Sequence, residues 1–473
     1  MFICVNKYRN LLYIMFHALF ALNIIRQVCP KIFGTVGSES ILVCQILFII
    51  LTIIVIFISK ENILNQVKQV FKCKWIIIGV AIYVLIDLFN CLYAEEKMYA
   101  FSKYIFICRS GLTAITILLY AAFIDRNLPV KKIIVNIGIT SLIISLMSYF
   151  LYYNLSNYTV IDKRIAMSAS YNEFAVTILM GFIGITVLLL INECSFIKKV
   201  VFIGLVSIIE IPAIYLSSSK RGILLLIIYI LCVTIFIFIK WIIFVVKENN
   251  LKDGIKKFLV CLCSIIIVYL CVIGHCYFFN NFNEVHIKEG KGLSTKERLS
   301  ESNLVEDGAR EGLWTVAING ISDFSKLEFF IGKGASYSSD LYDDLEGENA
   351  KIIYSLWDKS LKSNNWLDPH NIILNDFLEG GLIKVLSFFF VVVIIMYYLI
   401  HYKISNAISI ILLSYFAIIF AGLLISAHYG ALYNRWTVIV LTLMIIAVSY
   451  SHEGVINDES ICCFKRKRKK ISR

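Results

Sequence analysis

Residues 173–192 read EFAVTILMGFIGITVLLLIN, and residues 198–216 read KKVVFIGLVSIIEIPAIYL. Each stretch is nearly free of charge over the roughly 20 residues that a helix needs to cross a bilayer core. The whole chain of 473 residues is similar, with 59% hydrophobic residues, 16% charged residues, 4 prolines and a mean hydropathy of +0.79. A typical soluble domain has about 25% charged residues. The composition excludes a soluble globular enzyme, a disordered scaffold and a secreted disulfide module, and it indicates an all-α polytopic membrane protein.

Twelve apolar runs are long enough to span a membrane. They lie at about residues 11–28, 40–58, 75–93, 105–124, 133–153, 173–192, 198–216, 222–246, 258–279, 378–400, 405–427 and 435–451. We therefore expect spans one to nine within residues 1–280 and spans ten to twelve within residues 371–451. Residues 281–370 form a large loop containing short helices, and residues 452–473 form a basic tail.

The charge distribution predicts the orientation of these spans. The formal net charge is +12, but residues 281–370 hold 10 Lys/Arg and 16 Asp/Glu, so the loop is at −6 and the remainder at +18. The positive charges gather in alternate connections and in the tail, at Lys465–Lys470. This pattern is typical of a multi-pass protein of the cytoplasmic membrane with both termini in the cytoplasm, rather than of a nucleic-acid-binding protein. The tail could also contact anionic membrane lipid.

Several chemical signatures are absent from the sequence. None of the 14 cysteines lies in residues 281–370, and no Cys-x-x-Cys pair exists, so neither a disulfide framework nor a zinc or redox site is indicated. The chain also lacks a Walker A loop, an Asp-x-Asp motif and a nucleophile elbow. We therefore expect no metal and no cofactor, and a donor that is already activated.

Residues 368–371 (Asp-Pro-His-Asn) are the most informative short motif. Asp is a favoured N-cap and Pro is favoured at the first helical position, so a helix is predicted to begin at Pro369 and lead into the tenth span. His370 would lie in its first turn, where the helix dipole disfavours the imidazolium form. A neutral His can act as a general base. The alternative is a polar interfacial residue at a helix start.

Residues 217–222 (Ser-Ser-Ser-Lys-Arg-Gly) join spans seven and eight on the outer side, where two adjacent cations run against the positive-inside bias. Lys220 and Arg221 would precede free backbone N–H groups of a helix N-terminus, which suits a diphosphate. The alternative is contact with lipid headgroups. Arg310, in a predicted helical stretch at 310–322 that also carries Trp314, could reach the same anion or be a solvated charge. A turn is predicted at Gly332-Lys333-Gly334.

Other polar residues lie at or near the spans. Glu173 opens the sixth span and could contact a sugar or an arginine, while His428 and Arg435 lie near the connection of spans eleven and twelve. Within the spans, Asp87 and Glu210 are expected to face the bundle interior, with Glu210 paired to an Arg or Lys of a neighbouring helix. A proton relay is the alternative for such groups.

Taken together, these residues resemble the O-antigen ligase and O-antigen polymerase superfamily. The resemblance covers the twelve-span plan and four local patterns. Residues 171–175 (Tyr-Asn-Glu-Phe-Ala) resemble the Asn-x-x-Ala opening of a span, and residues 219–222 the Ser-x-Arg-Gly turn. Residues 308–314 and 330–334 resemble the Arg-x-x-x-Trp and Gly-x-Gly stretch. Residues 368–374 and 379–382 resemble the His-Asn-x-x-Leu and Glu-x-Gly signature. The sequence departs from the family at Gly381 and Lys384, where the family is usually more apolar.

The resemblance implies transfer of a glycan from undecaprenyl diphosphate to a sugar hydroxyl on the outer face of the cytoplasmic membrane. It implies that Arg221 and Arg310, together with Lys220, hold the diphosphate, and that His370 activates or orients the acceptor hydroxyl. Glu173, Asn371, His428 and Arg435 would line the cavity. The expected partners are the undecaprenyl-diphosphate-linked oligosaccharide, membrane lipid, and a flippase and a chain-length regulator. A surface-polysaccharide polymerase, for O-antigen or capsule, is favoured over a ligase that moves finished glycan to a lipid or protein acceptor. A transporter of lipid-linked oligosaccharide is the alternative from another class.

Overall fold

The computed structural model describes most of the chain as helix. It describes residues 2–28, 30–59, 73–95, 97–125, 128–154, 160–161, 164–165, 171–191, 195–248, 251–286, 304–343, 369–401, 404, 406–426, 431 and 434–450. Within these residues the only strands are β1 (Val160–Ile161) and β2 (Arg164–Ile165), which form one short antiparallel pair. The basic run of the tail and His428 lie outside the described residues.

The chain divides into two compact units. Unit 1 comprises residues 1–16, 45–130 and 303–473, and unit 2 comprises residues 17–44 and 131–302. Three helices contribute residues to both units: α1 (Phe2–Val28), α2 (Pro30–Ser59) and, with its first two residues in unit 1, α6 (Pro129–Asn154).

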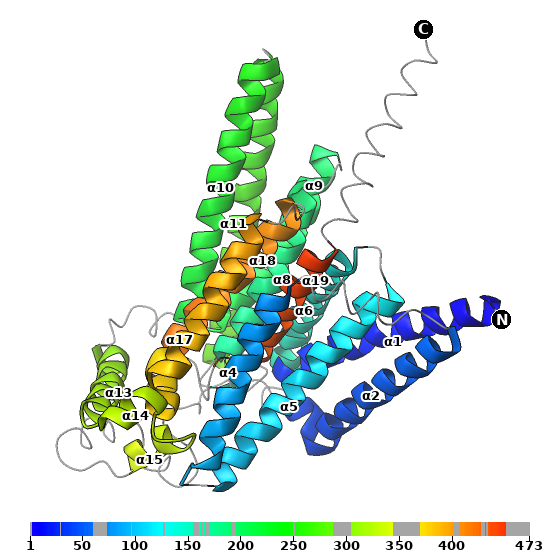
Figure 1. The fold of residues 1–473 in the computed structure, drawn as a ribbon. Coiled ribbons are helices and arrows are strands. Elements are labelled where there is room, and N and C mark those ends of the chain that lie inside the picture. The colour runs from blue at the N-terminus through cyan, green and yellow to red at the C-terminus, as the bar shows by residue number, and fades with distance from the viewer. Residues whose placement is uncertain are drawn as a thin grey trace. The chain divides into compact units, whose positions relative to one another are not determined.

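Besides parts of α1 and α2, unit 1 contains two helices early in the chain, three helices before α17, α17 itself and two helices after it. These elements are α4 (Lys74–Leu92), α5 (Lys97–Leu119) with the π-helical turn η2 (Tyr120–Ile124), α13 (Leu304–Ser322), α14 (Lys326–Ile331), α15 (Tyr337–Asp343), α17 (Ile372–His401), α18 (Asn406–Ser426) and α19 (Arg435–Ser449). Helix α17 packs along α4, and the two run side by side in Figure 1. Gly79 permits this approach, since a Cβ atom there would lie 3.1 Å from Val391.

Besides parts of α1 and α2, unit 2 contains five described helices. They are α6 (Pro129–Asn154), α8 (Tyr171–Ile191), α9 (Phe196–Leu216), α10 (Lys220–Glu248) and α11 (Leu251–His286). Helix α8 is apolar on every side, which is typical of a helix surrounded by neighbours, and most of it is buried against α9 and α10. Helix α9 also packs against α11.

Nine helices in the described part of the chain are long and apolar enough to cross a membrane. They are Tyr8–Val28, Glu39–Ser59, Lys74–Leu92, Ile107–Ile124, Pro129–Leu151, Tyr171–Ile191, Phe196–Leu216, Ile372–Leu399 and Ala407–Leu424. Shorter apolar helices, Ile265–Phe278 and Arg435–Ser449, coincide with two further predicted spans. The predicted tenth span begins earlier than expected, at Ile372 instead of residue 378. The helical fold with many helices of membrane-spanning length is therefore confirmed, and it indicates a multi-pass membrane protein. The number twelve and the orientation stay predictions.

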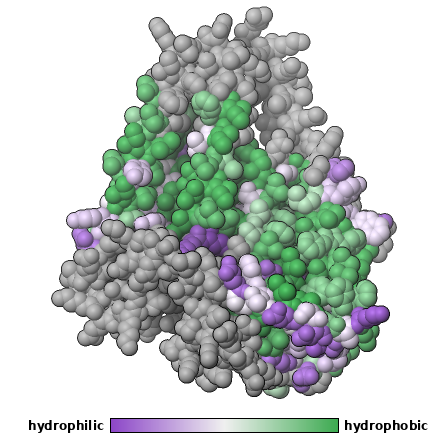
Figure 2. All heavy atoms as spheres, turned by 90° about the vertical axis from the view of Figure 1, so that its left-hand side faces the viewer, coloured by the Kyte–Doolittle hydropathy of each residue, from purple (hydrophilic) through white to green (hydrophobic). Residues whose placement is uncertain are grey.

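Hydrophobic side chains also dominate the exposed surface of these helices, as the coloured part of Figure 2 shows. On α4, Leu85 and Leu92 are 62% and 74% exposed, and on α17 Leu386 and Val393 are 56% and 64% exposed. Exposed apolar area of this extent is unfavourable in water. It fits helices whose outer faces contact lipid.

Candidate functional site

His370 lies immediately before α17, in a backbone conformation that side chains seldom adopt. Its φ angle is +50°, in the left-handed region, and its side chain is half-buried. Such a conformation costs ~1–3 kcal/mol and persists only where the surroundings hold it. The prediction that the helix begins at Pro369 is therefore wrong. Helix α17 begins at Ile372, because the backbone at His370 is not helical.

The residues on both sides of His370 are fixed by hydrogen bonds. The Nε1–H of Trp314, on α13, donates to the carbonyl oxygen of Pro369 at 3.0 Å. Asn371 is the N-cap, because its Oδ1 accepts from the backbone N–H groups of Ile373 and Leu374 at 2.9 and 3.3 Å. The predicted cap, residue 368, lies outside the described residues. Asn371, predicted to line a cavity, thus has a structural task at the head of α17.

Helix α13 contains the predicted helical stretch 310–322, which is confirmed. Arg310 lies in this helix one turn before Trp314, so its backbone position is on the side that approaches the start of α17. The buried face is made by Leu313, Val316 and Ala317, whereas Ile318 is 56% exposed. The apolar residues at 313, 314, 317, 318 and 321 have helical spacing in the sequence, but Ile318 lies on the exposed side of the helix.

In unit 2, the turn at residues 217–219 packs against the start of α8. The Oγ of Ser219 donates to Asn172 Oδ1 at 2.7 Å and accepts from the N–H of Gly222 at 3.1 Å, so it caps α10. A Cβ atom at Gly222 would lie 2.6 Å from the Cβ of Ala175. The motifs Asn-x-x-Ala and Ser-x-x-Gly are thus two halves of one contact. The contact fixes the first turn of α10, where Lys220 is exposed and Arg221 is half-buried.

The remaining predicted residues are at helix starts. Glu173 is half-buried in the first turn of α8. Arg435 is half-buried at the first position of α19, where Asn434 caps the helix by accepting from the N–H of Trp436 at 2.9 Å. Arg310, His370 and Arg435 belong to unit 1, and Glu173, Lys220 and Arg221 belong to unit 2. Each group is therefore positioned within its own unit.

The segment after α14 packs against a kink in α17 and is hydrogen-bonded to it. At Gly381 the backbone leaves the helix, with φ +63°, so the carbonyl groups of Leu378 and Glu379 are free. They accept from the N–H groups of Lys333 and Gly334, each at 3.0 Å. Gly332 and Gly334 also have positive φ angles, which confirms the predicted turn. We call residues 331–338 the docked segment.

The docked segment is held from α4 and α17 together. Tyr93, which follows α4, donates its hydroxyl to the carbonyl oxygen of Ile331 at 2.6 Å, and the N–H of Ala335 donates to the carbonyl oxygen of Asn90 at 3.2 Å. Ser338 Oγ donates to Glu379 Oε1 at 3.1 Å. Burial raises the pKa of Tyr93 to about 12, so its hydroxyl stays protonated at neutral pH.

Next to the docked segment, the side chains of Asp87, Asp376, Glu379 and Lys384 form what we call the Lys384 cluster. The ammonium nitrogen of Lys384 lies 2.5 Å from Asp87 Oδ1, 3.2 Å from Asp376 Oδ1 and 3.2 Å from Glu379 Oε2. No side chain of the four is more than 3% exposed. Tyr83 on α4 donates its hydroxyl to Asp376 Oδ2 at 2.8 Å. This pairing explains how α17 accommodates a lysine among buried residues.

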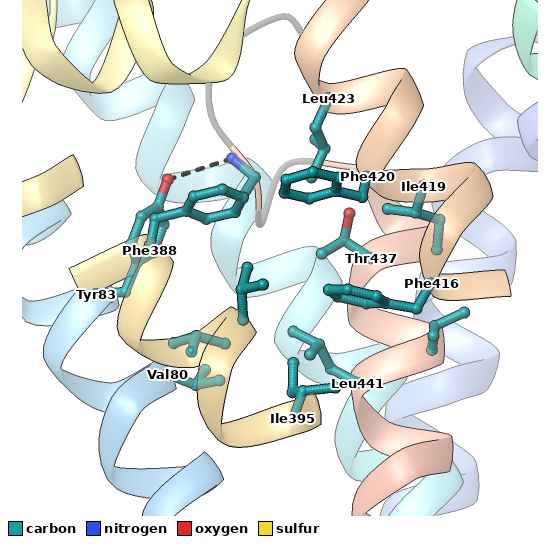
Figure 3. Close-up of a pocket in the computed structure, with 14 residues that line it drawn as sticks. Val80, Tyr83, Phe388, Ile395, Phe416, Ile419, Phe420, Leu423, Thr437 and Leu441 are labelled. Carbon is teal, nitrogen blue, oxygen red and sulfur yellow. Dashed lines mark hydrogen bonds between the residues drawn. The ribbon is translucent and has the colours of Figure 1, made fainter. Parts of the chain in front are cut away.

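Tyr83 joins the Lys384 cluster to a small apolar cavity of about 30 Å³, shown in Figure 3. The N–H of Ala431 donates to the Tyr83 hydroxyl at 3.3 Å, the dashed line in the figure. The cavity is lined mainly by aliphatic and phenyl side chains of α17, α18 and α19. A space of this size and polarity has no room for a sugar or a diphosphate, so it belongs to the packing of unit 1.

Unit 2 buries a different acid. Glu210 on α9 is fully buried and hydrogen-bonded to Ser141 Oγ on α6. We predicted that Glu210 pairs with an Arg or Lys of a neighbouring helix, and for the described residues this prediction is wrong. Among them, no cation contacts the Glu210 carboxylate, and its Oε2 has no hydrogen-bond partner. Gly181 leaves room for this contact, because a Cβ atom there would collide with Ser141.

Sequence reasoning singled out Asp87 and Lys384 separately but missed that they pair. Asp376 and Glu379 were not singled out as buried ionic groups, although three ionisable residues within nine positions of an apolar run were a visible signal. Within the described residues, no group of three His, Cys, Asp or Glu is arranged to hold a metal ion.

Comparison with known proteins gives no family. Neither a protein-family model nor a curated protein sequence matches the chain. The class that the fold defines is a multi-pass helical membrane protein with helices α13–α15 docked on a kinked span.

Proposed function

We propose that the protein is a glycosyltransferase that polymerises a surface polysaccharide at the outer face of the cytoplasmic membrane. The donor is a glycan on undecaprenyl diphosphate, and the acceptor is a sugar hydroxyl of a second lipid-linked glycan. The observation that carries the proposal is the constrained backbone at His370, held between the Trp314 contact and the Asn371 cap. Strain of this kind is concentrated at functional sites.

The reaction is a single displacement. The acceptor hydroxyl oxygen forms a bond to the anomeric carbon as the bond to the diphosphate oxygen breaks, so the configuration is inverted. His370 takes the hydroxyl proton as general base. The leaving diphosphate gains negative charge, which Arg310 of unit 1 is proposed to stabilise. The roles of Lys220 and Arg221 in holding a diphosphate stay predictions from the sequence. The bonds formed and broken need no metal ion or nucleotide.

Several features support this assignment over a purely structural one. The half-buried His370 is accessible enough to meet a substrate, while the backbone around it is fixed. The Ser219–Asn172 bond likewise fixes the helix start that carries Lys220 and Arg221. The roles of Glu173, Arg435 and His428 in a substrate cavity stay predictions from the sequence.

The test is transfer by the purified protein in lipid vesicles, with an undecaprenyl-diphosphate-linked repeat unit as donor and acceptor. We expect His370→Ala to lower the rate at least about 100-fold, the usual contribution of a general base. His401 is the matched control, because it is exposed at the far end of the same helix and stacks on Tyr397. His401→Ala should keep the wild-type rate. Normal product length from folded His370→Ala protein would refute the assignment.

Two alternatives are separated by the product. A ligase shares the chemistry, and a deletion strain then accumulates long lipid-linked chains, whereas loss of a polymerase leaves single repeat units. A transporter of lipid-linked oligosaccharide is favoured by one observation, the ionisable Lys384 cluster inside spanning helices. Flux across vesicles without new glycosidic bonds would support the transporter.

A further inference from the structure

Helix α14 exposes hydrophobic side chains although it is not one of the spanning helices. Leu327 is 67% exposed and Phe330 is 51% exposed, and no residue of this six-residue helix is buried. The two residues are three positions apart, so they share one face of the helix. Phe329 lies on another side, where its ring packs edge-to-face on Phe377 of α17 at 5.1 Å between centroids. The face of Leu327 and Phe330 therefore remains exposed after α14 has packed on α17.

The lengths of two spanning helices indicate where the bilayer core ends in unit 1. Helix α4 has 19 residues, which gives roughly 28 Å at ~1.5 Å per residue, close to the thickness of about 30 Å of a bilayer core. Helix α17 reaches the same length over residues 381–399 alone, so the turns before its kink are not needed to cross the core. The core is therefore expected to end near Leu92 on α4 and near Gly381 on α17.

The docked segment joins these two helix positions. The Tyr93 hydroxyl, one residue after α4, donates to the carbonyl oxygen of Ile331 at 2.6 Å. The N–H groups of Lys333 and Gly334 donate to the two carbonyl groups at the kink, each at 3.0 Å. Helix α14 packs on α17 and lies beside its first part in Figure 1. Because Ile331 is the last residue of α14, this helix is expected at the membrane boundary.

The exposed face of α14 continues the exposed apolar surface of α4 and α17. Phe89 and Leu92 in the last turn of α4 are 55% and 74% exposed, and Ile383, just after the kink, is 46% exposed. In the docked segment, the Lys333 ammonium donates to the Tyr337 hydroxyl at 3.3 Å and lies 4.6 Å from the centroid of its ring. Tyrosine is enriched at membrane–water interfaces, and lysine extends its ammonium group toward them. Lipid-facing and interfacial residue types thus occur together around α14.

We propose that α14 is an interfacial anchor, whose Leu327 and Phe330 side chains insert into the lipid bilayer at the boundary between headgroups and acyl chains. The apolar face of an interfacial helix lies about 5–10 Å into this boundary. A second protein fits this face less well, because a stable protein interface buries about 800 Å² on each partner, far more than one face of a six-residue helix offers. Insertion of α14 holds the docked segment at the membrane surface. The proposal does not depend on glycosyl transfer.

The test is depth-dependent fluorescence quenching of the full-length protein in lipid vesicles. An environment-sensitive fluorescent amino acid replaces Phe330 or, in two control proteins, Leu386 or Thr315. Leu386 is 56% exposed on α17 beyond the kink. Thr315 shares an exposed polar face of α13 with Glu311 and Asn319, four positions to either side. We expect nitroxide groups at shallow lipid positions to quench position 330 most strongly. Deep nitroxide groups should quench position 386 most strongly, and aqueous iodide should quench position 315.

Two results at position 330 would overturn the proposal. Quenching by iodide without quenching by nitroxide lipid would show that the face of Leu327 and Phe330 lies in water. Protection from both quenchers would show that protein covers this face, either a second copy of the chain or a segment of the same chain.

A second measurement needs no substitution. A hydrophobic carbene reagent that partitions into the bilayer modifies side chains exposed to lipid, and trypsin then releases residues 327–333 and 385–403 as separate peptides. We expect label in residues 327–333, at Leu327 or Phe330. Residues 385–403 are the positive control, because they contain the exposed Leu386 and Val393. Label in residues 385–403 with none in residues 327–333 would equally contradict the proposal.

Discussion

The Lys384 cluster of unit 1 and the Glu210–Ser141 pair of unit 2 both bury carboxyl groups within spanning helices. In unit 1 a lysine contacts three carboxylates, and Tyr83 and Ser338 supply further hydrogen bonds. In unit 2 a single hydroxyl faces Glu210. The first arrangement joins α4 and α17 through charge and α15 through the Ser338 hydroxyl, whereas the second joins α6 and α9 by one neutral donor. The difference predicts how strongly each unit depends on one side chain.

Lys384→Met should have the largest effect. The substitution removes the cation and leaves three carboxylates buried, which costs about 3–5 kcal/mol for a broken buried ion pair. We expect a large fall in the thermal unfolding midpoint of the protein in detergent, or loss of folded protein on size exclusion. Lys326→Met, at an exposed position of α14, is the control and should change stability by less than about 0.5 kcal/mol. Equal midpoints for the two variants would show that the cluster does not stabilise unit 1.

Gly381→Ala should have the next largest effect, because the kink carries the docked segment beside the cluster. The positive φ angle alone costs roughly 1–2 kcal/mol for a residue with a Cβ, and that Cβ would collide with the backbone of Phe330. Gly111→Ala in α5 is the matched control, since no atom lies within 4 Å of its added Cβ. It should stabilise the helix by about 0.5–1 kcal/mol. If both alanine variants shift the thermal midpoint in the same direction, the stability of the protein does not depend on the kink at Gly381.

The two serines allow a direct comparison of the units. Ser141→Ala leaves Glu210 without its hydroxyl partner and should cost about 1–3 kcal/mol, the range for a buried group left unsatisfied. Ser338→Ala removes one of several partners of Glu379 and should cost about 0.5–1.5 kcal/mol. Chemical or thermal unfolding of the two variants measures the order. A larger loss for Ser338→Ala would contradict the view that Glu210 depends on one contact.

Tyr93 should give the smallest effect, and only at high pH. Burial raises its pKa from 10 to about 12, so the folded state favours the protonated phenol. Its contribution is complete below about pH 10 and is lost as the pH rises through about 12. The thermal midpoint of wild type should therefore fall more steeply above pH 10 than that of Tyr93→Phe. At neutral pH the variant should lose roughly 1 kcal/mol, for one hydrogen bond. Parallel pH profiles would show that Tyr93 ionises as freely in the folded as in the unfolded chain.

The sequence was most informative where a local rule applies. The helices followed from apolar length, and the turn at Gly332-Lys333-Gly334 followed from its two glycines. The helix start before the tenth span was predicted incorrectly, because Asp and Pro gave a good local cap. Tertiary contacts instead hold His370 in a left-handed conformation, with Asn371 as the cap. The preference of Asp and Pro for the start of a helix was overridden by tertiary contacts such as the hydrogen bond from Trp314 to Pro369, which no local pattern encodes.

The candidate site shows the same division. The residues of the motifs at 172–175 and 219–222 were identified one by one, but their joint role as a close helix contact required Gly222 and Ala175 to be seen together. Lys384 stood out in the sequence as a departure from the pattern of the superfamily that the chain resembles. Its partner Asp87 lies almost 300 positions earlier, so nothing in the order of residues could connect the two.

By itself, the sequence determined that this chain has many helices long and apolar enough to span a membrane, because hydrophobic length is a property of consecutive residues. It also placed the polar residues that deserve a functional test, His370 foremost. Only the tertiary structure decided which buried charges are compensated, since α4 and α17 must pack before Asp87 meets Lys384. It also decided where α17 kinks, because the free carbonyl groups at Leu378 and Glu379 need the docked segment to satisfy them.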